Sequence, residues 1–302
     1  MENKKLYENC ILCPRNCNTN RNDGNIGACM VSGKLKLARA ALHYWEEPCI
    51  SGEAGSGAVF FSGCSLHCVF CQNEEISRGQ SGKEVEKERL AEIFLELQEK
   101  GANNINLVTP GQYVPHIIWA VEQARDQGLK LPIVYNTSSY EKVETIRRLE
   151  GIVDIYLPDF KYMSSDIAMK YSKAKDYPEV AKAAIAEMVR QQPNPVFDEV
   201  TGLMKRGVIV RQLLLPNLLE DAKAIVKYLY DAYGDNIYLS LMSQFTPLSN
   251  VENYPELNRK VSEKEYEEYI NYAIELGVEN GFIQEEDVAD ESFIPHFDCE
   301  GV

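Results

Sequence analysis

Residues 57–77 read GAVFFSGCSLHCVFCQNEEIS, with a short apolar run over 58–61 followed by Cys64, Cys68 and Cys71. A loop of this length can fold so that all three sulfurs point at one centre. Three thiolates are one short of a closed tetrahedral zinc site or of a fully ligated four-iron cluster. On a four-iron cluster they would hold three irons and leave the fourth free for a substrate. The odd number of thiolates therefore suggests a reactive metal centre.

The chain holds nine cysteines, and seven of them lie in two tight groups. The second group has four members, spaced by two, three and eleven residues: Cys10, Cys13, Cys17 and Cys29. In a large intracellular chain such groups favour metal sites over disulfides. Four thiolates suit zinc or a second iron–sulfur cluster, and the sequence leaves both open beside a third alternative, buried free thiols. We expect the isolated Cys49 and Cys299 to be structural thiols, with a redox or radical role as the alternative for Cys49.

After the central motif, short apolar stretches alternate with segments of helical period. Six strands are predicted, mostly apolar rather than alternating, with Arg211 and Gln212 interrupting the fifth: 58–61, 104–109, 132–135, 152–157, 207–215 and 237–242. The helices are marked by apolar residues three or four positions apart and by glycines after several of their last turns. Their predicted ranges are 83–100, 114–127, 143–149, 164–191 in two pieces, 219–230 and 262–274.

Strands that are apolar on both faces are typical of a parallel sheet covered by helices. Right-handed crossovers would curl such a sheet, and a closed barrel would need eight units. Six units predict an α/β fold, an open and partial (β/α)6 TIM-like barrel, over residues 57–302. Residues 1–56 show no strong helical or strand period, and we expect them to form a Cys-rich segment packed on the barrel.

Polar residues stand at the predicted carboxyl ends of the strands, where parallel α/β barrels place their reactive groups. They include Thr109, Asn136, Asp159, Lys161 and Arg211. Because the loop with the three cysteines follows the first strand, we expect all of these groups to share one pocket. An ordinary ion pair at the barrel rim is the alternative for Lys161 and Arg211, and a plain turn residue for Asn136.

The composition excludes several classes of protein. The formal net charge is −15, and such an acidic surface repels phosphate backbones, which argues against non-specific binding of nucleic acid. The first residues contain no apolar core of a signal peptide, and no run of about 18 apolar residues could span a membrane. We therefore expect a cytoplasmic protein.

The pattern Cys-x3-Cys-x2-Cys, with Phe70 before its last cysteine, resembles the cluster motif of the radical S-adenosylmethionine (SAM) enzymes. Four short sequence segments are similar to those of the pyruvate formate-lyase activating enzyme-related (PflX-like) group. They are HYWEEP at 43–48, FFSGC at 60–64, CQN at 71–73 and GANNINLVTP at 101–110. The resemblance implies the partial barrel, a [4Fe-4S] cluster on Cys64, Cys68 and Cys71, and SAM as cosubstrate. It also implies that one electron from the cluster cleaves SAM to methionine and a 5′-deoxyadenosyl radical.

The resemblance suggests SAM contacts at the strand ends. Lys161 and Arg211 are expected to hold the SAM carboxylate, and Asn136 and Asp159 the ribose hydroxyls. The pair Asp159-x-Lys161 resembles the Asp-Leu-Lys motif of glycyl radical enzyme activases. The superfamily holds the SAM amine with a Gly-Gly-Glu motif, which is absent here, so we expect Thr109 or a backbone carbonyl to take that role.

Three functions stay open at this point. The first is a radical SAM enzyme that abstracts hydrogen, with a glycyl radical enzyme as one conceivable target and an electron donor of the flavodoxin or ferredoxin type. The second is a radical SAM enzyme acting on a small molecule or RNA, although the acidic charge weighs against RNA. The third is a non-catalytic module with structural zinc in both cysteine groups.

Overall fold

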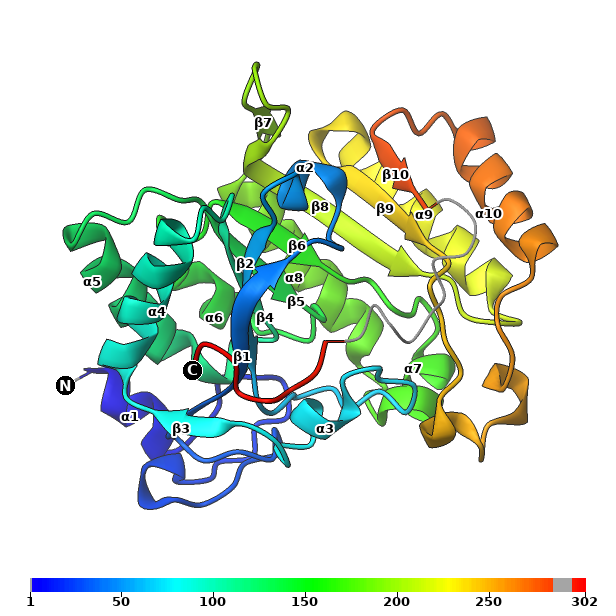
Figure 1. The fold of residues 1–302 in the computed structure, drawn as a ribbon. Helices are drawn as coiled ribbons and strands as arrows, with labels where there is room; N and C mark the ends of the chain where they lie inside the picture. Colours follow the sequence, from blue (N-terminus) through cyan, green and yellow to red (C-terminus); the bar gives the residue numbers. More distant parts are fainter. Residues whose placement is uncertain (1, 285–294) are drawn as a thin grey trace.

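A curved sheet of ten strands forms the framework of the molecule (Figure 1). The computed structural model describes residues 2–284 and 295–302. The strand order is β10-β9-β8-β6-β5-β4-β2-β1-β3, and β7 pairs with β8 beside this path. The strands are β1 Leu35–His43, β2 Ser56–Phe61, β3 Lys83–Val85, β4 Ile105–Val108, β5 Ile133–Thr137, β6 Ile155–Pro158, β7 Val196–Phe197, β8 Met204–Leu213, β9 Tyr238–Met242 and β10 Gly281–Ile283.

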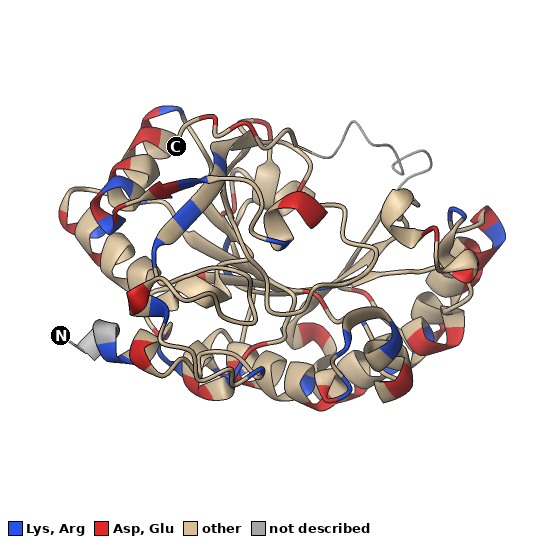
Figure 2. Cartoon of the chain, turned by 90° about the horizontal axis from the view of Figure 1, so that it is seen from below, with Lys and Arg blue, Asp and Glu red and all other residues tan. Residues whose placement is uncertain are grey.

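The six predicted strands are present as β2, β4, β5, β6, β8 and β9, and each pairs in parallel with the next. The main helices are α4 Lys87–Glu99, α5 Val114–Asp126, α6 Val143–Arg147, α7 Ser165–Ser172, α8 Tyr177–Gln191, α9 Leu219–Tyr233 and α10 Glu263–Leu276. They lie along the outer side of the curved sheet (Figure 2). The predicted α/β fold, an open partial barrel with a Cys-rich N-terminal extension, is confirmed.

Strand β1 has no counterpart among the predicted elements. It pairs antiparallel with β2, and its register shifts between Leu37 and Arg39. This bulge breaks the period-two pattern, and the three alanines of the strand have weak strand preference. Strand β3 pairs with β1 over residues 83–85, so the predicted start of the first helix at 83 is wrong, and α4 begins at Lys87. The division of the chain at residue 57 stays a prediction.

The connection between β1 and β2, residues 44–55, reaches into the barrel from the amino ends of the parallel strands. Its short helix α2 (Pro48–Ser51) buries Cys49 and Ile50. These side chains belong to one apolar cluster with inward-facing residues of the strands: Val134, Ile155, Leu157, Met204 and Ile209. Burial, with the nearby Glu47 charge, raises the pKa of Cys49 to about 12, so this thiol is neutral and packs as an apolar group.

The last residues of the chain return to β1 (Figure 1). The Cys299 N–H donates to the Ala38 carbonyl at 3.0 Å, and the Ala40 N–H donates to the Glu300 carbonyl at 2.8 Å. Arg39 also pairs with the Asp298 carboxylate at 3.1 Å. Cys299 is half-buried, and its backbone holds the tail on β1.

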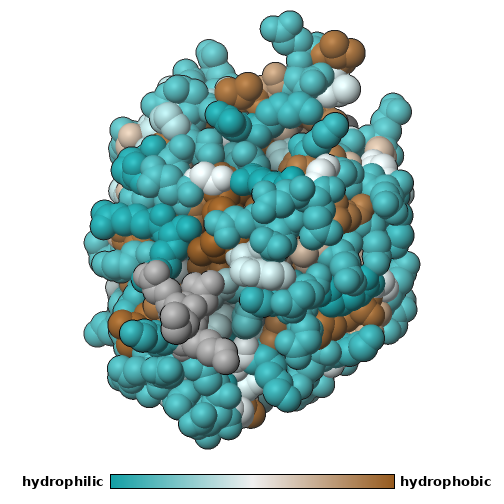
Figure 3. Space-filling model, turned by 90° about the vertical axis from the view of Figure 1, so that its left-hand side faces the viewer, coloured by the Kyte–Doolittle hydropathy of each residue, from teal (hydrophilic) through white to brown (hydrophobic). Residues whose placement is uncertain are grey.

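The outer surface is that of a charged protein. The face in Figure 3 is mostly hydrophilic, with hydrophobic residues in small groups, and Figure 2 shows acidic and basic residues spread along the helices. No helix in the described part of the chain is long and apolar enough to cross a membrane.

A buried carboxyl group between the sheet and the helices makes stability depend on pH. Glu141 is buried, and its Oε1 accepts hydrogen bonds from Thr137 Oγ1 at 2.9 Å and Tyr135 at 3.3 Å. Burial raises its pKa from 4.5 to about 7, although both hydrogen bonds act in the opposite direction. The folded state therefore keeps this proton while the unfolded state releases it, and stability falls as the pH rises from about 4.5 to 7.

We expect Glu141→Gln to remove this dependence. The variant should be about 3 kcal/mol more stable than the parent protein at pH 8, and only about 1 kcal/mol or less at pH 5. Urea unfolding at both pH values measures the difference. Glu144→Gln, at an exposed position of α6, is the control and should show no pH-dependent difference. An equal gain for Glu141→Gln at pH 5 and pH 8 would contradict the assignment.

Candidate active site

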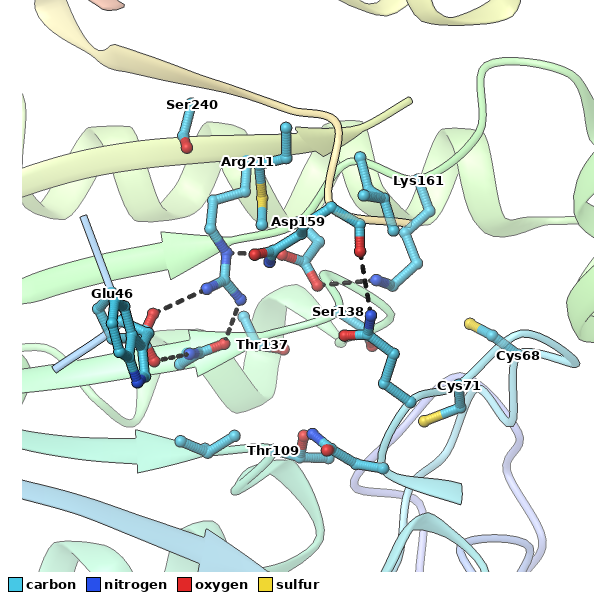
Figure 4. A pocket seen from close by; sticks show the side chains of 18 of the residues that line it. Glu46, Cys68, Cys71, Thr109, Thr137, Ser138, Asp159, Lys161, Arg211 and Ser240 are labelled. Atoms are coloured by element: carbon cyan, nitrogen blue, oxygen red, sulfur yellow. Dashed lines mark hydrogen bonds and ion pairs between the residues drawn. The ribbon is translucent and has the colours of Figure 1, made fainter. Parts of the chain in front are cut away.

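A cavity of about 420 Å³ opens inside the barrel toward the carboxyl ends of the strands, a volume in the range of small-ligand pockets. It brings together the three central cysteines and all five polar residues predicted at the strand ends. These are Cys64, Cys68, Cys71, Thr109, Asn136, Asp159, Lys161 and Arg211. Figure 4 shows the sulfurs of Cys68 and Cys71 on the side of the pocket where Lys161 lies. The predicted convergence of these groups is therefore present, while their contact with SAM stays a prediction.

The cysteine loop is held by its own backbone and by aromatic packing. The Cys71 N–H donates to the Cys68 carbonyl at 3.2 Å, and the Leu66 N–H points at the Cys64 sulfur at 3.4 Å. Phe70 is buried between the rings of Tyr162 and Phe245. These contacts direct the loop at the pocket.

The donor set fits a cationic cluster. Burial raises the pKa of Cys64, and burial with the charges of Cys68 and Cys64 raises the pKa of Cys71 to about 12. Without a metal, thiolates at these positions would repel each other, and bound iron ions would remove that repulsion. In the described residues, no three His, Cys, Asp or Glu side chains close around a single ion.

Arg211 on β8 is the centre of a buried charge network (Figure 4). Its guanidinium donates to the Asp159 carboxylate at 2.8 Å, the Glu46 carboxylate at 3.0 Å and the Asn136 side-chain oxygen at 2.6 Å. Lys161 donates to the second oxygen of Asp159 at 2.8 Å. Charge-assisted bonds of this kind fix the orientation of every partner. The network joins β5, β8, the residues that follow β6 and the β1–β2 connection.

The pKa shifts keep this network ionised at neutral pH. Burial would raise the pKa of Asp159, but Arg211 and Lys161 hold it below its usual value. Burial would lower the pKa of Lys161, but Asp159 raises it above its usual value. Two cations and a carboxylate therefore face the cavity together, beside the cysteine loop.

Sequence reasoning assigned no role to Glu46 and Glu47. Both line the cavity from the β1–β2 connection, and Glu46 also accepts from Asn106 at 3.0 Å. Glu47 is 8% exposed, and its Oε2 has no hydrogen-bond partner. Burial, opposed by Arg211 and reinforced by Glu46, raises the pKa of Glu47. The prediction considered only residues at the carboxyl ends of strands, and these two residues lie before β2, so it missed them. They do belong to the HYWEEP segment that resembles the PflX-like group.

Thr109 marks the end of β4 with a left-handed backbone, φ +57°. Its N–H donates to the Asn136 carbonyl at 2.9 Å, and its own carbonyl accepts from Gln112 at 2.9 Å. The Gln112 amide also donates to the carbonyls of Ser62 and Gly63 at 3.0 and 2.9 Å. These hydrogen bonds therefore connect the carboxyl end of β2, which leads into the cysteine loop, to the carboxyl end of β4 at Thr109.

Two further features near the site concern His67 and the second cysteine group. His67 lines the cavity, and its ring is directed at the Ala28 carbonyl, 2.8 Å from Nε2. Of the second cysteine group, Cys10 and Cys29 are buried, and Cys13 and Cys17 are half-buried. None of these four cysteines is among the residues that line the cavity.

Gly63 permits close contact between the two cysteine groups. Its φ is +89°, and a Cβ there would stand 2.7 Å from the Cys29 carbonyl oxygen. We expect Gly63→Ala to lower the free energy of unfolding by about 1–3 kcal/mol and to reduce the iron retained after reconstitution. Urea unfolding and iron analysis measure both effects. Gly128→Ala, with φ +104° and nothing within 4 Å, isolates the backbone strain, and equal losses in both variants would refute the steric argument.

Comparison with known proteins identifies the domain that carries this site. Residues 58–205 match the radical SAM superfamily, and this match begins in β2 and includes the cysteine loop and the Asp159-x-Lys161 pair. The chain is a member of the radical SAM superfamily through this domain, and it is an enzyme of that class. Members of the superfamily carry a [4Fe-4S] cluster and use SAM, so the prediction of these two cofactors is confirmed at the level of the family.

The similar proteins indicate the fold of this chain but not its substrate. An uncharacterized protein of Methanocaldococcus jannaschii is 27% identical over 277 residues, which cover 89% of this chain and 75% of that protein. The structure of Streptococcus suis SuiB bound to S-adenosylmethionine matches with TM-score 0.50 and 13% identity over 74% of this chain. The FeFe-hydrogenase maturase HydG of Carboxydothermus hydrogenoformans also gives TM-score 0.50 and 13% identity, over 78% of this chain and 56% of that one. This chain spans 49% of the SuiB chain, about half its length.

Proposed function

We propose that this enzyme binds SAM in the barrel cavity, between the cluster loop and the Arg211 network, and abstracts a hydrogen atom from a substrate held in the same cavity. The observation that carries the proposal is that the three cysteines and the charged strand-end residues line one cavity of about 420 Å³. Cys64, Cys68 and Cys71 would hold the [4Fe-4S] cluster, which would supply the electron for reductive cleavage of SAM and so the radical chemistry of hydrogen abstraction.

The residues of the chain bind and orient SAM. SAM carries a carboxylate and an amine, and Lys161 with Arg211 offers cationic donors for the carboxylate. Asp159 and Asn136 offer acceptors for the ribose hydroxyls, and Thr109 lines the wall nearest the end of β4. Because the network is formed by buried, charge-assisted bonds, these groups need little rearrangement when SAM enters.

The target that we propose is a backbone glycine of a glycyl radical enzyme, with a reduced flavodoxin or ferredoxin as electron donor in the cytoplasm. The support is the Asp159-x-Lys161 pair, which resembles the activase motif and lies in the cavity beside the cysteine loop. A small molecule is the second candidate. The unpartnered Oε2 of buried Glu47 favours it, because that oxygen can accept a hydrogen bond from a substrate hydroxyl or amine.

The second cysteine group is the remaining part of the proposal. Cys10, Cys13, Cys17 and Cys29 are proposed to hold zinc or a second iron–sulfur cluster.

Anaerobic turnover with dithionite tests the function and separates the two targets. We expect 5′-deoxyadenosine to form, and the addition of a pyruvate formate-lyase-type enzyme to produce a glycyl radical signal in electron paramagnetic resonance. Deoxyadenosine without that radical would reject the glycyl target and favour the small molecule. Protein that carries its full cluster and releases no 5′-deoxyadenosine would overturn the proposed function itself.

A further inference from the structure

A second group of thiols lies in residues 10–29, which contact the cluster loop. Gly27 lies between two of these thiols. A Cβ placed at Gly27 would be 3.3 Å from the Cys17 sulfur and 3.6 Å from the Cys29 sulfur, so both sulfurs are close to this residue. The Cys17 sulfur also lies 3.8 Å from the Cys10 carbonyl oxygen, and Cys10 and Cys17 pack in one small cluster with Tyr7. Three of the four thiols are thus gathered on one side of the barrel, away from the SAM cavity.

A buried cation lies among these thiols. Arg21 is 1% exposed, and its guanidinium donates to the carbonyls of Ser32 and Gln112 at 2.7 and 2.9 Å and approaches the Cys10 sulfur at 3.7 Å. Its Nε has no hydrogen-bond partner, and it pairs with no carboxylate in residues 2–284 and 295–302. The rings of Tyr7 and Tyr113, with centroids 4.7 and 5.8 Å away, provide only their weaker cation–π attraction.

A charge in this position requires a counter-charge, because leaving an ion buried and unpaired costs several kcal/mol. Neutral thiols or disulfides supply none. Four thiolates on Zn²⁺ carry a net charge of about −2, and four thiolates on an oxidised iron–sulfur cluster carry the same. The guanidinium of Arg21 would then balance part of the charge of such a centre, and its free Nε–H can donate to a thiolate.

We infer that Cys10, Cys13, Cys17 and Cys29 form an anionic metal–tetrathiolate centre whose charge is balanced by Arg21, and that this centre supports the SAM-cluster loop. The inference rests on the proposed second metal site and adds its charge partner and its role. The four thiols are not closed around one ion in the described residues, but neither are Cys64, Cys68 and Cys71, the predicted ligands of the SAM cluster.

The support of the cluster loop follows from direct contacts. The Cys29 carbonyl accepts from the Cys64 N–H at 3.2 Å, and the Ala28 carbonyl lies 2.8 Å from His67 Nε2. Arg15 donates to the Ser65 carbonyl at 2.9 Å. A metal that orders residues 10–29 therefore orders the surface on which Cys64 is placed.

Metal analysis of a variant without the SAM cluster tests the centre in isolation. Full-length protein with Cys64→Ala, Cys68→Ala and Cys71→Ala is purified without oxygen, and its zinc, iron and sulfide are counted. We expect one zinc per chain, or two to four irons with matching sulfide. Loss of this metal on adding Cys10→Ser and Cys29→Ser would complete the assignment. A triple variant without bound metal overturns the inference, whereas the iron lost from the parent protein reports separately on the SAM cluster.

The Arg21 series tests the charge balance even where the cysteine variants misfold. In the triple variant, Arg21→Gln should release the metal to a chelator about 10–100-fold faster, as for other groups that support metal ligands. Arg21→Lys keeps the charge and should recover part of the effect. Arg15→Gln is the matched control, because Arg15 holds the cluster loop without hydrogen-bonding any cysteine sulfur. Equal release from Arg21→Gln and Arg15→Gln would overturn the role of Arg21.

Discussion

Cys68→Ala is expected to bring the release of 5′-deoxyadenosine down to background while the barrel stays folded. Cys68 is buried in the loop after β2 and lines the cavity, so its removal takes one of three thiolates from the cluster. The loop lies outside the main strands, and six parallel strands keep their pairing without it. Iron analysis, deoxyadenosine release under dithionite and far-UV circular dichroism measure the three parts of this result.

Cys299→Ala is the matched control for this prediction. Cys299 is a half-buried thiol that contacts β1 through its backbone, and it is not part of the cavity lining. The control should retain iron and activity. A Cys68→Ala protein that releases deoxyadenosine at the parent rate would show that Cys68 is not a cluster ligand.

Arg211→Met is expected to lower the free energy of unfolding by about 3–5 kcal/mol, because it leaves the carboxylates of Glu46 and Asp159 buried without their cation. The Arg211 side chain is only 13% exposed, so water replaces little of the lost interaction. SAM binding should weaken by about tenfold or more, since the same guanidinium is the proposed carboxylate ligand. Urea unfolding and SAM titration of the reconstituted protein measure the two effects.

Two further variants separate charge from geometry at this position. Arg211→Lys keeps the charge but loses the fork that reaches Asp159, Glu46 and Asn136 together, so it should recover only part of the stability. Adding Glu46→Gln to Arg211→Met removes one unbalanced carboxylate, and this double variant should be more stable than Arg211→Met alone. A loss below about 1 kcal/mol in Arg211→Met would argue that the network is solvated and weak.

The sequence predicted the parallel part of the fold because its strands are apolar on both faces and its helices have clear ends. Ser262 and Glu265 form a capping box at the start of α10, where the sequence predicts a helix over 262–274. The strand ends also located the cavity, since parallel strands place their last residues on one edge.

The contributions of antiparallel and irregular segments could not be predicted in the same way. Strand β1 carries a bulge that hides its period, and β10, although it is parallel to β9, is only three residues long. Glu46 and Glu47 reach the cavity through a connection that folds back into the barrel, and only tertiary structure reveals such a path. The approach of Cys29 to Cys64 joins residues 35 positions apart, which spacing rules do not connect.

The central claim is that three sulfurs hold a four-iron cluster whose open iron binds SAM. The most direct measurement is the electron paramagnetic resonance spectrum of the dithionite-reduced parent protein before and after SAM is added. The spectrum of the variant with Cys64→Ala, Cys68→Ala and Cys71→Ala is subtracted to remove any signal of the second centre. We predict a cluster signal that changes shape when SAM binds. A cluster signal that SAM leaves unchanged would contradict the account.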